Sequence, residues 1–212
     1  MEKTAANTIN GININIKNGD LTAETADCLV VPEFNSCSSR GGVGAAIEDA
    51  GMAEGLDAYD AIVKKQPREF GDAILTPSGR AGVQLAHVVT AGADDNNQFR
   101  VVNTAMYKAL VAANAHGLKT IALPELGTGI IGSLTQEQSA KAIFNAVYRF
   151  SQECPSSSIN GVSFVVFRGS TEPAQKVLDS KSYVDSTAPQ KGKKPFSLSA
   201  FARGLQHMIN RR

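Results

Sequence analysis

The 212-residue sequence has few cysteines and histidines, three of each, and no tryptophan. The cysteines are Cys28, Cys37 and Cys154. Their odd number and the absence of a CxxC spacing argue against a disulfide framework. The histidines stand singly along the chain, which argues against a zinc motif. We therefore expect a reducing, cytoplasmic setting, no bound metal and no cofactor.

Long apolar runs are also missing. No stretch approaches the roughly 18 apolar residues of a transmembrane helix. The first residues, MEKTAANTINGININ, lack the apolar core of a secretion signal. The sequence therefore predicts neither a membrane span nor secretion.

Net charge is nearly absent, at +1 for the whole chain, but it is unevenly distributed. Residues 181–212 hold seven basic side chains and one acid, so this tail carries about +6 and residues 1–180 about −5. The two parts are therefore interpreted separately.

Strand and helix signals alternate along the first part. Short apolar or alternating runs typical of strands lie at residues 11–17, 28–31, 72–76, 83–90, 120–123 and 162–167. Helical patterns lie at residues 45–51, 53–64, 101–115, 136–152 and 172–178. This order indicates βαβ units, so we predict an α/β domain whose mixed, mostly parallel sheet is covered on both faces.

Two glycine clusters directly follow predicted strands. They are Arg40-Gly41-Gly42-Val43-Gly44 and Gly127-Thr128-Gly129-Ile130-Ile131-Gly132. Ligands of parallel sheets bind beyond the carboxyl ends of the strands, and glycine-rich turns can point several backbone N–H groups at a phosphate. Neither cluster is a P-loop, since no lysine follows the last glycine. Each glycine cluster has two interpretations. It is only a tight turn between a strand and a helix, or the two clusters together bind a diphosphate from opposite sides.

The order of these motifs resembles the macrodomain family. Residues 18–22 read NGDLT, 27–31 read DCLVV, 121–124 read IALP and 127–132 read GTGIIG. Asn35 precedes the first glycine cluster, and the strand at 83–90 carries His87, which we expect to be a buried core histidine. The resemblance covers residues 11–180 and implies a three-layer α-β-α fold that binds ADP-ribose.

The resemblance also implies roles for single residues. Asp20 would accept a hydrogen bond from the adenine amino group, unless it only stabilises its turn, and the Leu21 backbone would frame the ring. Ile130 and Ile131 would cover the distal ribose, and Phe167 either stacks on adenine or belongs to the core. The implied ligand-binding set is Asp20, Leu21, Asn35, Gly41, Gly42, Val43, Gly44, Gly127, Thr128, Gly129, Ile130, Ile131, Gly132 and Phe167.

Catalysis is a separate hypothesis. Hydrolytic macrodomains commonly carry N-A-A-N where this chain reads Val31 to Asn35 as VPEFN. Asn35 fills that role after a one-residue shift or simply caps the loop. Glu48 is either a general base or a solvated helix residue, and Glu33 is similarly ambiguous. The catalytic candidates are thus Asn35 and Glu48, for hydrolysis of ADP-ribosyl groups or deacetylation of O-acetyl-ADP-ribose.

The basic tail divides into a flexible linker at residues 181–196 and an amphipathic helix at 197–212. Its apolar face could dock on this domain, another copy, a partner groove or an anionic membrane. The basic linker could contact poly-ADP-ribose or RNA. A third possible function is therefore an interaction module that is recruited through this tail.

Overall fold

A seven-stranded sheet forms the centre of the protein, whose residues 7–184 are described by a computed structural model. The strands are β1 (Thr8–Ile9), β2 (Ile12–Asn18), β3 (Cys28–Glu33), β4 (Ala73–Pro77), β5 (Gln84–Val89), β6 (Thr120–Pro124) and β7 (Gly161–Val166). Their order across the sheet is β1-β2-β7-β6-β3-β5-β4.

The inner strands run parallel and the two edge strands run antiparallel. β2, β7, β6, β3 and β5 form the parallel part, while β1 and β4 pair antiparallel with β2 and β5. β3 and β6, which lead into the two glycine clusters, are direct neighbours, with Cys28 opposite Ile121. The mixed, mostly parallel sheet is confirmed. Because β3 and β6 run parallel, both glycine clusters follow the carboxyl ends of adjacent strands.

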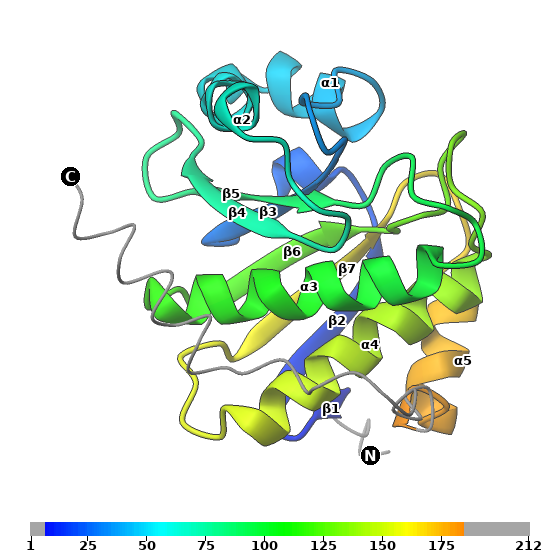
Figure 1. Ribbon diagram of the computed structural model, residues 1–212. Coiled ribbons are helices and arrows are strands. Elements are labelled where there is room, and N and C mark those ends of the chain that lie inside the picture. The colour runs from blue at the N-terminus through cyan, green and yellow to red at the C-terminus, as the bar shows by residue number, and fades with distance from the viewer. Residues whose placement is uncertain (1–6, 185–212) are drawn as a thin grey trace.

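The helices cover both faces of this sheet. They are the 3₁₀ turn η1 (Leu21–Ala23) and helices α1 (Val43–Asp49), α2 (Ala53–Lys65), α3 (Gln98–Ala115), α4 (Gln136–Glu153) and α5 (Glu172–Ser180). α3 and α4 lie side by side in front of the strands, away from α1 and α2 (Figure 1).

Strand β3 shows how the residue pattern produces the layers. Cys28 and Val30 pack into the core that contains α3, α4 and α5, whereas Leu29 and Val31 pack into the core that contains α1 and α2. A continuous apolar run is what a strand buried on both faces requires. The three-layer α-β-α class is therefore confirmed.

Local signals also account for helix starts. Thr135 accepts a hydrogen bond from the Gln138 backbone, and the Gln138 side chain accepts one from the Thr135 backbone, which fixes the start of α4. α1 begins directly after Gly42, whose φ of +53° favours a residue without Cβ.

The chain still packs against the body after α5. Tyr183 is 4% exposed, its ring meets Phe144 edge-on, and its carbonyl accepts a hydrogen bond of 2.7 Å from Asn145. The described residues end at Val184. Residues 185–196 of the predicted linker and the whole predicted C-terminal helix lie outside them.

Within residues 7–184, no helix combines the length and apolar character needed to cross a membrane.

Candidate ligand-binding cleft

A cavity of about 490 Å³ opens where β3, β6 and β7 end. It is lined by the segment between β3 and α1 (residues 34–42, the first loop) and by the segment between β6 and α4 (residues 125–135, the second loop). Many of the residues predicted from sequence line it: Gly41, Gly42, Val43, Gly127, Thr128, Gly129, Ile130, Ile131, Gly132 and Phe167.

Other lining residues were not predicted from sequence. These are Pro32, Ser39, Thr90, Ala91, Gln98, Pro124, Glu125 and Val165. Most of them are ordinary strand-end residues, and their shared signal is a position at or just after the carboxyl end of β3, β5, β6 or β7. Gln98 has no such signal, because it enters the cavity from the first turn of α3.

A buried carboxylate holds the first loop from the sheet side. Glu33 is fully buried at the end of β3, and one of its oxygens accepts a hydrogen bond from the Ser39 backbone N–H. Its other oxygen lies 2.8 Å from Nδ1 of His87, whose Nε2 lies 2.8 Å from Oγ1 of Thr76. Burial raises the pKa of Glu33, and the contact with His87 opposes this only in part. His87 is thus a buried histidine with a partner on each nitrogen, as expected.

Arg40 holds the first loop from the helix side. Its guanidinium donates to Glu48 of α1 at 3.0 Å and to Asp57 and Asp60 of α2 at 2.7 and 2.9 Å. Asp60 also accepts from the backbone and hydroxyl of Ser38. Burial alone would raise the pKa of Asp60, but the hydrogen bonds from Ser38 and Arg40 outweigh it and lower that pKa. The loop is therefore fixed to both helices.

Gly44 shapes the first loop without lining the cavity. A Cβ at this position would lie 1.5 Å from the carbonyl oxygen of Ser39. Its N–H donates to the carbonyl of Gly41 at 3.1 Å. Only glycine allows the first turn of α1 to approach the loop this closely.

The second loop is closed at its base in the same way. A Cβ on Gly132 would lie 2.1 Å from the carbonyl oxygen of Gly127, which also accepts a hydrogen bond of 2.9 Å from the Leu134 backbone. Gly127 itself has a φ of +77°. Beyond this closed base, Ile130 projects fully exposed and Ile131 half-exposed.

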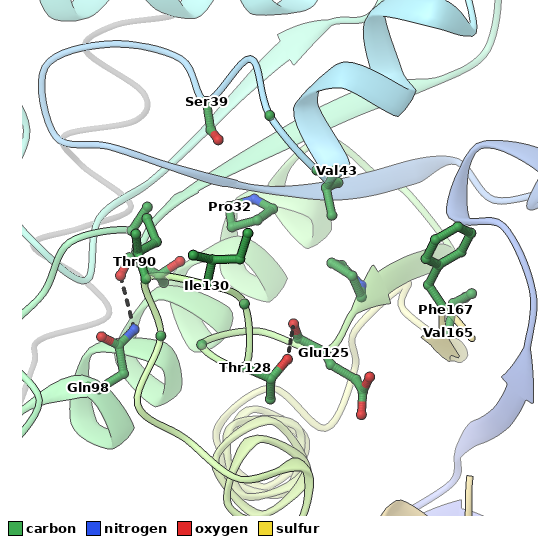
Figure 2. A pocket seen from close by; sticks show the side chains of 18 residues that line it. Pro32, Ser39, Val43, Thr90, Gln98, Glu125, Thr128, Ile130, Val165 and Phe167 are labelled. Carbon is green, nitrogen blue, oxygen red and sulfur yellow. Dashed lines mark hydrogen bonds between the residues drawn. The ribbon is translucent and has the colours of Figure 1, made fainter. Parts of the chain in front are cut away.

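The lining residues differ between the two ends of the cavity (Figure 2). Phe167 and Val165 stand at one end, and Thr90 and Gln98 at the other. Gln98 is buried, and its Nε2 donates to the carbonyl oxygen of Thr90 at 3.0 Å. Phe167 is 65% exposed, which is open enough for a flat group to stack on it.

The lining of the cavity is poor in ionisable side chains. Glu125 is the one ionisable side chain among the lining residues of the described chain, and burial raises its pKa. Five glycines also line the cavity, and glycine-rich turns can bind an anion through their backbone N–H groups. The hydroxyls of Thr90 and Thr128 donate to backbone carbonyls, so neither is paired with a base that would activate it for nucleophilic attack.

The family model for the Macro domain matches residues 32–143, more than half of the chain. This chain belongs to the Macro domain family. The matched segment of the macrodomain begins in β3 and ends in α4, so it includes both glycine-rich loops.

Relatives differ in how much of their length this macrodomain covers. A Thermotoga maritima protein is 27% identical over 157 residues, which is 72% of this chain but 26% of that protein, so the chain spans about a quarter of it. The O-acetyl-ADP-ribose deacetylase of Escherichia fergusonii is 30% identical over 124 residues, 56% of this chain and 70% of the enzyme.

A solved structure supports the same fold. A variant of the Oceanobacillus iheyensis macrodomain with ADPR superimposes with a TM-score of 0.69 at 22% identity, over 82% of this chain and 96% of the other. The likeness extends over most of residues 7–184 and establishes the architecture of the macrodomain.

Five of the predicted site residues do not line the cavity: Asp20, Leu21, Asn35, Gly44 and Glu48. Asp20 is exposed at the start of η1, where its Oδ1 accepts hydrogen bonds from the backbone and hydroxyl of Thr22 at 2.9 and 2.8 Å. The side chain of Leu21 is buried in the core beside α1 and α2. Asp20 therefore stabilises its turn, with Oδ2 outside these bonds.

The two predicted catalytic residues of the macrodomain are engaged in loop structure. The backbone carbonyl of half-buried Asn35 accepts a hydrogen bond of 2.8 Å from the backbone N–H of Arg68. The carboxylate of Glu48 forms an ion pair with Arg40. Within residues 7–184, no three histidine, cysteine, aspartate or glutamate side chains are grouped so that they could hold a metal ion.

Proposed function

We propose that this macrodomain binds ADP-ribose, free or attached to protein, between its two glycine-rich loops. The observation that carries the proposal is the cavity at the ends of β3 and β6, which both loops line with glycine backbone. The bound state of the Oceanobacillus relative, which was solved with ADPR, supports this choice of ligand. The match of the Macro domain model over both loops supports it further.

We assign the parts of the ligand between the two ends of the cavity. The diphosphate would lie between Gly41–Val43 and Gly127–Gly132, where backbone N–H groups can donate to its oxygens. The base would stack on Phe167 at the open end, and its amino group would reach Oδ2 of Asp20. The distal ribose would lie under Ile130 and Ile131, toward Thr90 and Gln98. Asn35 and Gly44 would hold the first loop in the shape that contacts the ligand.

Calorimetric titration with ADP-ribose tests the proposal. Gly129→Glu should reduce affinity at least tenfold, because it places a carboxylate beside the diphosphate. Gly129→Ala is the matched control, since a Cβ there meets nothing within 4 Å, and it should bind nearly as the wild type does. A wild-type protein that releases no heat at high ligand concentration would refute the proposal.

A second candidate function is hydrolysis of the same ligand, as a deacetylase of O-acetyl-ADP-ribose or a remover of ADP-ribose from carboxylates. The named Escherichia relative favours it. We propose Asn35 and Glu48 as the residues to test, with Asn35→Ala and Glu48→Gln. Release of acetate from O-acetyl-ADP-ribose, or of label from a modified protein, that both variants abolish would support it. A wild type as inactive as buffer would exclude it.

We further propose that the protein acts in the cytoplasm. We also propose that residues 181–212 are a basic segment, with a linker that begins after the packed Tyr183 and a C-terminal helix, which adds contacts to poly-ADP-ribose or RNA. The seven basic residues of this segment support the proposal. Deleting residues 190–212 should weaken binding of the polymers and leave binding of monomeric ADP-ribose unchanged. Equal polymer affinity with and without the tail would contradict it. If the tail instead recruits a protein partner, recruitment is lost while both nucleotide affinities persist.

A further inference from the structure

A cation lies over the aromatic ring at the open end of the cleft. The guanidinium carbon of Arg168 is 4.9 Å from the centroid of the Phe167 ring. Phe167 lines the cavity and is labelled at its right-hand end in Figure 2, whereas Arg168 is not among the lining residues. The ring of Phe167 is thus shared between the cavity and a guanidinium that does not itself line the cavity.

The backbone of Arg168 has an unusual conformation. Its φ is +57°, a left-handed conformation that arginine rarely adopts. This conformation occurs two residues after the end of β7, in the segment where the side chain of Arg168 lies over the ring of Phe167. Non-glycine residues are held in this region only where the surrounding structure determines it.

Arg168 also lacks a competing acidic partner. Among residues 7–184, no carboxylate forms an ion pair with it, in contrast to Arg40, which contacts three. The ring of Phe167 is thus the contact that its guanidinium makes. A cation is attracted to the face of an aromatic ring, so the guanidinium favours this orientation of the exposed Phe167 ring.

We propose that Arg168 is a positioning residue for recognition of the base. Its guanidinium holds the Phe167 ring with the opposite face toward the cleft, and the base of the ligand stacks on that face. This inference rests on the proposed binding of ADP-ribose. Because a base is recognised through its flat face in such a stack, Arg168 contributes affinity for any ligand that carries one, without contacting the ligand itself.

A double-mutant cycle tests the inference by calorimetry with ADP-ribose. Arg168→Asn removes the guanidinium but keeps a residue that tolerates the left-handed backbone. It should weaken binding about two- to fivefold, the range of an exposed cation–aromatic contact. Phe167→Leu keeps an apolar contact but offers no ring face. In that background Arg168→Asn should have no further effect, because the ring through which it acts is gone.

Each outcome separates the inference from the proposed function. Arg168→Gly, which also permits the positive φ, should reproduce the loss seen with asparagine, and thermal unfolding checks that every variant is folded. An equal loss in the wild-type and Phe167→Leu backgrounds would mean that Arg168 acts as a charge on the diphosphate, and would overturn the inference. Unchanged binding by Arg168→Asn overturns it too. A wild type that does not bind ADP-ribose overturns the proposed function instead.

Discussion

The glycines of the two loops serve two different purposes, and the space around each one separates them. At Gly44 and Gly132, an added Cβ would meet a backbone oxygen at 1.5 and 2.1 Å. At Gly41 and Gly129, an added Cβ meets nothing within 4 Å. The first pair therefore fixes the shape of the loops, whereas the second pair lines the cavity at positions with room for a small side chain.

We predict that Gly44→Ala lowers the free energy of unfolding by about 1–3 kcal/mol, because backbone must move to admit the methyl group. Gly41→Ala should leave stability unchanged or slightly higher, since alanine restricts the unfolded chain. Urea unfolding of both variants measures the difference. Equal stabilities for the two would show that the approach of α1 to Ser39 does not constrain the loop.

Asp20 allows its two roles, in the turn and toward a base, to be separated. Asp20→Asn keeps Oδ1 for the two hydrogen bonds from Thr22 but turns the other acceptor into a donor. We predict wild-type stability for this variant and at least fivefold weaker binding of ADP-ribose, in line with the cost of an unmatched donor. Asp20→Ala should lose both. If the asparagine variant binds as tightly as the wild type, Asp20 serves only the turn.

At the scale of the element, strand β3 contains a buried charged residue that its apolar pattern does not predict. Its residues Cys28 to Val31 form the buried strand expected from sequence. Its last residue, Glu33, is a buried carboxylate whose contacts with Ser39 and His87 connect the strand to the first loop. The contact with His87 joins residues 54 positions apart, so no local pattern could reveal it.

Glu33 predicts a pH dependence of stability with a definite sign. Burial raises its pKa in the folded state above the value in the unfolded chain, so the folded state binds more protons between the two values. The stabilisation that Glu33 contributes is therefore complete below about pH 4.3, the ordinary glutamate pKa, and is lost as pH rises through the raised one. Glu33→Gln removes this titration.

Urea unfolding of the wild type and Glu33→Gln between pH 4 and pH 7 checks the prediction. The free energy of unfolding of the wild type should fall relative to that of the variant as pH increases. Parallel curves, or a difference that grows in favour of the wild type, would contradict the raised pKa.

For the whole molecule, the sequence predicted the order of elements, the mixed sheet and the two loops, because apolar periodicity and glycine chemistry are local signals. It did not predict the two-residue β1, which is too short to show a period. It also missed Gln98, whose place in the cleft depends on how α3 packs on the sheet. The ion pairs of Arg40 with Asp57 and Asp60 of α2 were not predicted either, since both aspartates have the pattern of ordinary surface residues of a helix.

The end of the folded body can be tested by two truncations. A protein ending at Val184 should unfold at nearly the temperature of the full chain and bind ADP-ribose with the same affinity. One ending at Ser180 loses Tyr183, which leaves Phe144 uncovered and the amide of Asn145 without its acceptor. We predict that this shorter protein is less stable by roughly 3–5 kcal/mol, the usual cost of removing a buried aromatic side chain. Equal thermal stabilities would place the boundary at residue 180.

The pairing of β3 with β6 has a consequence for how the protein comes apart. The two strands come from opposite halves of the chain, and each delivers one loop to the cleft. Because the cavity is lined by both loops, a nucleotide held between them would link the two halves of the chain across the β3–β6 pair. Its binding free energy adds to the barrier against separating the halves, and the occupied protein should outlast the empty one under proteolysis.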